Sequence, residues 1–328
     1  MATKIVDGVD FGVIGFNLNE GKHLGEFGGT WHKHPDFKCQ PDAVSFESAA
    51  TLLKWGINKV PTFTPDGKAT GGFALQDTDS NILYPFVGDD YKVVSNQQLL
   101  EAVSRLMAAD EDLQIESVMS LDGRRIVAFN VIFGKMAIDG DPSDTVMRFT
   151  IMNFNGGQSL KFLTHFVRMM CWNTASLALN TASKIFHVRH LGEMESKITV
   201  ATDKLSDLRA EARSAAEKLG KLSSVKIDTT AAEKFLLGHF DVEKNDTSRT
   251  GVRRNNLVNE AMQIFLTKDD LQLMDMTALR LWNSVTDFHD HHTEKRGGAD
   301  AGTIYLDSVI GGESDRKDEF LKRMMALV

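Results

Sequence analysis

The sequence predicts an α+β protein, with an antiparallel β-sheet in its N-terminal half and helices in its C-terminal half. In the N-terminal half, short apolar runs alternate with tight-turn segments, of which Asp122-Gly123 and Asn155-Gly-Gly157 are the clearest. Asp-Gly between two apolar runs is typical of a two-residue hairpin. In the C-terminal half, apolar residues recur at steps of four and three, the period of a helix that buries one face. We therefore expect an antiparallel sheet with one face covered by helices.

Five elements are expected between residues 45 and 107. They are, in order, a short helix, three strands and a longer helix, over residues 45–53, 59–63, 72–78, 82–87 and 95–107. Ser45 and Ser95 each precede an apolar run with helical spacing, and serine is a favoured N-cap because its oxygen accepts a bond from a free amide of the first turn. Pro85 places its strand at a sheet edge or beside a bulge, since proline has no amide hydrogen to donate.

Four longer strands should follow as two hairpins, over residues 113–121, 124–133, 146–154 and 159–167, with the two turns named above between them. After the last strand, Cys171, Ala175, Ala178 and Ala182 recur with the spacing of an amphipathic helix. Their small side chains would let this helix lie close to whatever it covers.

A long helix is expected over residues 194–219, where apolar residues form an a/d seam of about three heptads. The seam residues are Met194, Ile198, Ala201, Leu205, Leu208, Ala212, Ala215 and Leu219. Two interpretations are open: the helix mediates oligomerisation or docking, or it packs on its own chain. Further helices are expected near residues 230–240, 252–266 and 276–292, with a short one ending at Leu327.

The chain is expected to divide into three parts. Residues 1–45 are rich in glycine and read as an extended N-terminal arm, which would dock on a neighbour or stay mobile. Residues 46–192 hold the antiparallel sheet and its helices. Residues 193–328 form a helical region that packs on the second part or extends from it.

The composition is ordinary for a soluble globular protein, with 42% hydrophobic and 25% charged residues in a chain of 328. The formal net charge of -8 argues against histone-like binding of nucleic acid by the whole surface, but it does not exclude a local basic groove. Cys39 and Cys171 fit reduced thiols better than a disulfide. With no secretory signal pattern and no apolar run of transmembrane length, we expect a cytoplasmic protein without a membrane partner.

Common catalytic motifs are absent from the sequence, so an enzymatic activity stays uncertain and we expect no cofactor. The sequence contains no Gly-x-Ser-x-Gly elbow and no phosphate-binding P-loop. His289 and His292 lie one helical turn apart and are weak candidates for metal ligands. Against a metal, Lys295 and Arg296 follow at once and would repel a cation, and imidazoles near a helix C-terminus also suit the helix dipole.

Basic and aromatic residues are concentrated between the first hairpin and residue 190. The candidate nucleic-acid-binding residues are Arg124, Arg125, Arg148, Lys161, Phe166, Arg168, Trp172, Lys184, Arg189 and His190. Single-strand binding requires cations along the phosphates and rings on which bases stack. The alternative interpretation is that the arginines are solvated strand positions and that the aromatic rings belong to the core.

Several motifs resemble the phage/plasmid-like proteins grouped as domain-of-unknown-function family 932. The central ones are Val167-Arg-Met-Met-Cys171-Trp-Asn-Thr-Ala175 and His187-Val-Arg-His190, followed by a long charged helix. Trp31-His32, Tyr91-Lys-Val-Val-Ser-Asn96, Leu281-Trp-Asn-Ser-Val285 and Asp290-His-His292 agree as well. The resemblance covers nearly the whole chain, with a departure at Trp172, where the family more often has a polar residue.

This resemblance implies a phage, prophage or plasmid protein of the bacterial host cytoplasm, from a family without a settled activity. Such genomes often carry single-strand annealing proteins, which share a small antiparallel sheet backed by a helix and assemble into rings or filaments. By that analogy we expect a homo-oligomer that binds single-stranded DNA and promotes annealing or recombination without ATP. Arg168, Lys184, Arg189 and His190 would contact phosphates. The alternative is a structural or interaction protein that assembles through its long helix and has no nucleic-acid activity.

Overall fold

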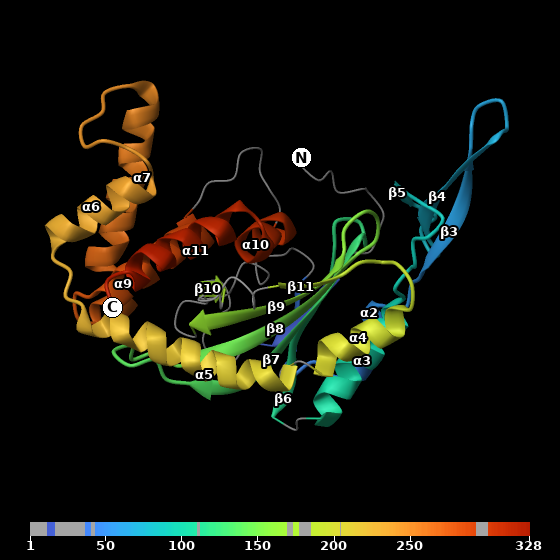
Figure 1. Cartoon of the computed structure of the whole chain (residues 1–328), viewed down its shortest axis with the longest axis horizontal. Helices are drawn as coiled ribbons and strands as arrows, with labels where there is room; N and C mark the ends of the chain where they lie inside the picture. The colour runs from blue at the N-terminus through green and yellow to red at the C-terminus, as the bar shows by residue number, and fades with distance from the viewer. Residues whose placement is uncertain are drawn as a thin grey trace.

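The computed structural model describes residues 12–16, 37–40, 43–109, 112–168, 173–176, 185–203, 205–292 and 301–328. Antiparallel strands dominate the N-terminal half and helices the C-terminal half, which confirms the α+β prediction (Figure 1). Within the described residues, no helix is both long enough and apolar enough to cross a membrane.

The centre of the large sheet is an antiparallel meander of β6 (Leu113–Leu121), β7 (Ile126–Met136), β8 (Thr145–Phe154) and β9 (Leu160–Arg168). Both predicted hairpins are confirmed, but the first has a four-residue loop in place of the expected two-residue turn. Leu121 pairs with Ile126, the amide of Arg125 donates to the carbonyl of Asp122 (3.1 Å), and Asp122, Gly123 and Arg124 have positive φ angles of 51°, 63° and 64°. On one side, β10 (Asn173–Ser176) and β11 (Ile185–Val188) both pair with β9. On the other side, β1 (Gly12–Phe16) pairs with β6, and β2 (Phe37–Gln40) pairs with β1.

Helices cover both faces of this sheet (Figure 1). Because successive strand residues point to opposite faces, Phe149 and Ile151 of β8 join the main core, which includes the apolar face of α3 (Asn96–Ala109). Met152 and Phe154 join a second core with Tyr305 of α10 (Ala301–Ile310) on the opposite face. The prediction of a sheet covered on one face therefore needs correction: β8 is buried along its whole length.

A second, three-stranded sheet projects from the end of the large one. It consists of β3 (Ile57–Phe63), β4 (Ala69–Asp77) and β5 (Leu83–Val87), in that order. The hydroxyl of Tyr84 donates to the carbonyl of Gly123 (2.6 Å), and Arg124 pairs with the buried Asp77. The small sheet is thus attached to the turn between β6 and β7.

The predicted helix caps are present. Ser45 accepts a bond from the amide of Ser48 at the start of α2 (Phe46–Leu52). Ser95 accepts from the amide of Gln98 (3.1 Å), and the Gln98 side chain accepts from the amide of Ser95 (2.9 Å), so α3 begins with a reciprocal capping box.

The C-terminal half contains α4 (Met194–Asp203), α5 (Leu205–Lys221), η2 (Leu222–Ser224), α6 (Thr229–His239), α7 (Arg249–Thr267), α8 (Asp269–Gln272), α9 (Ala278–Asp287), a π-helical turn (Phe288–His292), α10 and α11 (Gly312–Met325). α4 and α5 lie against the sheet on the side of α3, and α10 and α11 lie on the other side (Figure 1). The helices expected after residue 229 are confirmed at these positions.

One further prediction differs from the structure, and one concerns the long helix. Residues 173–176 form strand β10, where the spacing of small residues predicted part of a helix, because they pair with β9 in register from Asn173 to Ser176. The long helix expected over 194–219 is helical on both sides of Lys204, which lies outside the described residues: α4 ends at Asp203 and α5 begins at Leu205. Described seam residues such as Ile198, Ala212 and Leu219 are buried in the main core, which supports packing on the chain itself.

The predicted N-terminal arm lies mostly outside the described residues. Its two described segments, β1 and β2, are extended, as expected, but they pair with the large sheet of their own chain. Trp31 and His32 lie outside the described part of the chain.

Candidate nucleic-acid interface

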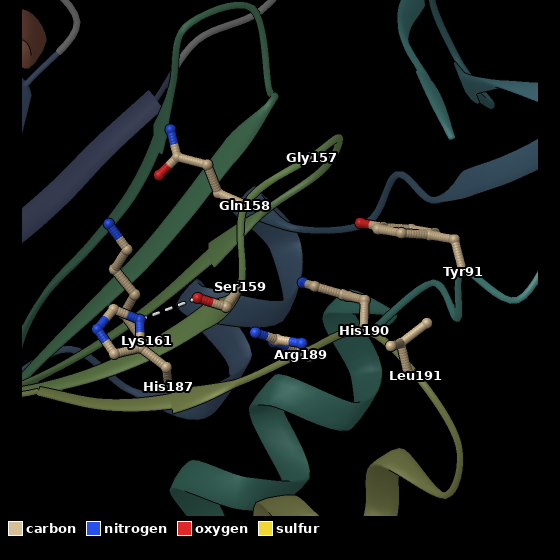
Figure 2. A pocket seen from close by; sticks show the side chains of 9 residues that line it. All are labelled: Tyr91, Gly157, Gln158, Ser159, Lys161, His187, Arg189, His190 and Leu191. Atoms are coloured by element: carbon tan, nitrogen blue, oxygen red, sulfur yellow. Dashed lines mark hydrogen bonds between the residues drawn. The ribbon is translucent and has the colours of Figure 1, made fainter. Parts of the chain in front are cut away.

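An open cavity of about 690 Å³ lies where β9 begins and β11 ends (Figure 2). Its lining comprises Tyr91, Gly157, Gln158, Ser159, Lys161, His187, Arg189, His190 and Leu191. We call this the β9–β11 groove. Its volume is within the range of sites that hold a small molecule or one unit of a polymer.

The register between β9 and β11 places two of the basic side chains together. Lys161 of β9 lies directly opposite His187 of β11, and cross-strand partners in a sheet point to the same face. The glycines at the tip of the β8–β9 turn, Gly156 and Gly157, have φ angles of 111° and 86°. This turn brings Ser159, the residue before β9, within hydrogen-bond distance of His187.

Positive charge in the groove comes from Lys161 and Arg189. Nζ of Lys161 lies 4.8 Å from the centroid of the Phe154 ring, and partial burial lowers its pKa. Nδ1 of His187 lies 2.9 Å from Oγ of Ser159. Burial, and then the charge of Lys161, lower the pKa of His187 below its usual 6.5, so this ring is neutral at pH 7. The exposed Arg189 guanidinium completes the basic side of the groove.

An aromatic pair forms the other side. The rings of Tyr91 and His190 are stacked, with centroids 4.8 Å apart and planes inclined by 12° (Figure 2). The hydroxyl of Tyr91 donates to the carbonyl of Phe154 and accepts from the amide of Gly156, each at 3.3 Å. Burial raises the pKa of this phenol. Tyr91 is thereby fixed against the turn that leads into β9.

His190 is held on two sides by the residue that follows Tyr91. The amide of Lys92 donates to the carbonyl of His190 (2.8 Å), and Nδ1 of His190 lies 3.0 Å from the carbonyl of Lys92. A carbonyl only accepts, so Nδ1 must carry the proton. Burial lowers the pKa of His190, which leaves the ring neutral and Nε2 as an acceptor. His190 is 4% exposed, and Nε2 has no hydrogen-bond partner among the described residues.

The comparisons with known proteins identify the family. The model for the domain of unknown function DUF932 matches residues 84–310, more than half of the chain. The chain belongs to the DUF932 family. The matched region contains every residue that lines the groove. Neither the curated proteins nor the solved structures include a significant match.

In this DUF932 protein, the groove unites two of the motifs that carry the resemblance. Tyr91 opens the Tyr91–Asn96 segment, and His187 and His190 bound the other. Of the residues predicted to bind nucleic acid, Lys161, Arg189 and His190 meet in the groove. Trp172 and Lys184 lie outside the described residues.

Arg148 and Arg168 are inside the protein instead of on its surface. Arg148 is 2% exposed and forms a bidentate pair with Glu116, the extra residue of a bulge in β6. Arg168 is 4% exposed; it donates to Asp141 at 2.7 and 2.9 Å and also pairs with Asp270. Neither guanidinium is placed where a phosphate could reach it, so we remove both from the proposed interface.

Three other residues predicted to bind nucleic acid form ion pairs or pack in the core. Arg124 is buried against Asp77, with 3.4 Å between Nη1 and Oδ2. Arg125 pairs with Asp122 in the same turn. Phe166 is 3% exposed and belongs to the main core. Arg124 and Phe166 are therefore removed from the proposed interface, whereas Arg125, whose side chain is 38% exposed, stays a prediction.

His289 and His292 do not converge on one point. Nε2 of His289 lies 2.7 Å from Nε2 of His239, and its Nδ1 lies 2.5 Å from Glu313. His292 faces Asp287 (3.2 Å) and Glu260 (3.5 Å). Across the described residues, no group of three or more His, Cys, Asp or Glu side chains has the arrangement of a metal site.

Reasoning from the sequence did not single out Tyr91 and Ser159 as site residues. Ser159 follows a recognisable turn, but its contact with His187 depends on strand pairing between segments far apart in the chain. The contact between Tyr91 and His190 likewise depends on tertiary structure, and only the motifs at residues 91 and 190 could have drawn attention to it.

Proposed function

We propose that the protein binds single-stranded DNA in the β9–β11 groove. The observation that carries this proposal is the combination of two cations, Lys161 and Arg189, with the stacked rings of Tyr91 and His190 in one open cavity. Sequence-independent strand binding uses cations against the phosphates and aromatic rings against the bases. The net charge of -8 does not oppose it, because affinity depends on the local field that the strand meets.

We also propose that binding promotes the annealing of complementary strands by an oligomer, without ATP. The groove holds a short piece of a strand, so several copies are needed to line up a longer one. The antiparallel meander β6–β9, preceded by α3, supports the analogy with annealing proteins at the level of fold alone. An annealing assay with two complementary labelled strands and no nucleotide tests this second step separately from binding.

The binding step is tested with the double variant Lys161→Ala/Arg189→Ala. Fluorescence anisotropy with a labelled single-stranded oligonucleotide should show at least about a tenfold loss of affinity at low salt, because two phosphate contacts are removed. Lys234→Ala/Arg253→Ala is the matched control: it removes two exposed cations from α6 and α7, which lie at the other side of the molecule (Figure 1). Equal affinity of both double variants and the wild type would refute the groove as the binding site.

A structural or interaction protein is the second candidate, and one observation favours it. Phe63, Leu83 and Phe86 of the three-stranded sheet are 60%, 61% and 60% exposed. Large exposed apolar side chains that lie on one small element are typical of a contact surface. The double variant Phe63→Ser/Phe86→Ser should then dissociate an oligomer in analytical ultracentrifugation, whereas an unchanged sedimentation coefficient would exclude this surface.

A phage or plasmid origin and action in the cytoplasm of a bacterial host complete the proposal. The motifs that resemble phage/plasmid-like proteins support the origin. Fractionation of cells that express the chain at low level tests the location, with recovery in the cytosolic fraction as the expected result.

A further inference from the structure

We infer that Nε2 of His190 accepts a hydrogen bond from an N–H group of a nucleobase, so that the groove reads the base as well as the backbone. The inference rests on the proposed function, because it names what the aromatic side of the same groove recognises. It starts from an unsatisfied atom: His190 is 4% exposed, it lines the cavity, and its Nε2 has no partner among the described residues.

The proton on His190 is fixed by its surroundings. Nδ1 donates to the carbonyl of Lys92 at 3.0 Å, and the stacked ring of Tyr91 holds the imidazole plane. The neutral ring therefore presents the Nε2 lone pair, which attracts a hydrogen-bond donor and repels a phosphate oxygen. The phosphates would bind Lys161 and Arg189 on one side of the groove, and His190 would bind a hydrogen-bond donor of the ligand on the other side.

In Figure 2, the His190 ring lies parallel to that of Tyr91, and a ring nitrogen points away from the backbone toward Ser159 and Arg189. The two sequence neighbours of His190, Arg189 and Leu191, are exposed and line the same cavity. Nε2 itself is buried, so a base reaches it only when the side chains that cover it move aside. An unpaired buried acceptor is costly, and a ligand that satisfies it recovers that free energy on binding.

The chemistry of DNA then identifies the donor. An internal DNA nucleotide has no donor on its phosphodiester and no hydroxyl on its deoxyribose, so its only N–H groups are on the base. In thymine the single donor is N3–H. Methylation of N3 removes this donor and preserves the ring, the sugar and every phosphate charge.

The experiment compares oligo(dT) with oligo(N3-methyl-dT) of the same length by fluorescence anisotropy. The wild type should bind the methylated strand about fivefold more weakly, the loss expected for one hydrogen bond. His190→Phe keeps a ring against Tyr91 and has no Nε2 acceptor; His190→Asn keeps a side-chain amide that can donate to Lys92. Both variants should bind the two strands equally, and His190→Phe, which keeps the stacked ring, should do so at the affinity of the wild type for the methylated strand.

The outcomes separate the two claims. If the wild type binds neither strand at low salt, the proposed function fails and this inference falls with it. If the wild type binds both strands equally, single-strand binding stands and the role of His190 is refuted. If the preference for the unmethylated strand persists in both His190 variants, the methyl group clashes or contacts another residue, and the role of His190 is refuted as well.

Discussion

The ring of Tyr91 stacks on the ring of His190, and the next residue, Lys92, exchanges two hydrogen bonds with His190. This contact joins a segment that precedes α3 to the segment that follows β11. Both segments contain motifs that resemble the same family, and both lie within the DUF932 match. The contact therefore gives a physical reason why these two motifs occur in one protein: together they build one wall of the groove.

Replacing Tyr91 should separate the role of its ring from that of its hydroxyl. Tyr91→Leu removes the stack, which is worth about 1 kcal/mol, so oligonucleotide affinity should fall roughly fivefold as His190 loses its fixed plane. Tyr91→Phe keeps the ring and loses the bonds to Phe154 and Gly156, so its affinity should stay within about twofold of the wild type. Anisotropy titrations check both variants; similar losses in the two would show that the hydroxyl, and not the stack, matters.

Arg168 should contribute to folding and not to strand binding. Arg168→Met leaves the buried carboxylate of Asp141 without its cation and removes one of the two cations beside Asp270, which should lower the free energy of unfolding by about 3–5 kcal/mol. Urea denaturation measures the loss. Lys226→Met breaks an exposed pair with Asp275 and should cost less than about 1 kcal/mol. Where Arg168→Met remains folded, a marked loss of oligonucleotide affinity would contradict its placement in the interior.

Replacing Gly140 should destabilise the protein for two reasons, and replacing Gly67 for only one. Both have φ near +80°, where a side chain adds roughly 1 kcal/mol of strain. A Cβ on Gly140 would also lie 2.2 Å from Cβ of Ser223 in η2, whereas nothing lies within 4 Å of one on Gly67. Gly140→Ala should therefore be destabilised by about 1–3 kcal/mol more than Gly67→Ala in thermal unfolding. Equal destabilisation of the two would mean that η2 moves away freely.

The buried His165 should make stability fall on mild acidification. Burial, and then the charges of Arg148 and Lys317, lower its pKa in the folded state to about 3. Since the unfolded state retains a pKa near 6.5, it binds more protons, and the folded state loses stability as pH falls through 6.5 toward 3. Between pH 7 and 5.5 this amounts to about 1 kcal/mol for one histidine.

The variant His165→Leu isolates this effect, because it removes the titrating ring from a site where Nε2 has no partner among the described residues. Its unfolding free energy should depend less on pH over the same interval, in which most carboxylates stay ionised. His239, whose pKa burial also lowers to about 3, remains in both proteins and contributes equally. A pH profile of the variant parallel to that of the wild type would contradict the assignment to His165.

The sequence predicts well what depends on neighbouring residues. The hairpin that contains Asp122 and Gly123, the Ser95 cap and the period of β6 to β9 are local features, and the structure confirms each of them, although the hairpin loop has four residues instead of two. Whether the arginines are buried or exposed depends on elements that are distant in the sequence. Arg148 lies on a strand face that would be solvated if helices covered one side of the sheet alone; α10 and α11 cover that face, and the bulge at Glu116 supplies its partner.

The groove was predictable only in part, because some of its features are local in the sequence and others depend on tertiary contacts. Lys161, Arg189 and His190 were recognisable as a basic cluster near strand ends. The strand register that sets Lys161 opposite His187, and the packing that sets Tyr91 on His190, are tertiary relationships that the spacing of residues does not contain.

Photocrosslinking tests the central claim most directly. A single-stranded oligonucleotide with photoreactive bases would be irradiated with the wild-type protein, and the crosslinked peptides identified by mass spectrometry. The account predicts crosslinks within residues 155–161 and 185–191 and at Tyr91, with their loss in Lys161→Ala/Arg189→Ala. Crosslinks confined to α6 and α7, or crosslinks unchanged in the double variant, would show that the strand does not bind in the β9–β11 groove.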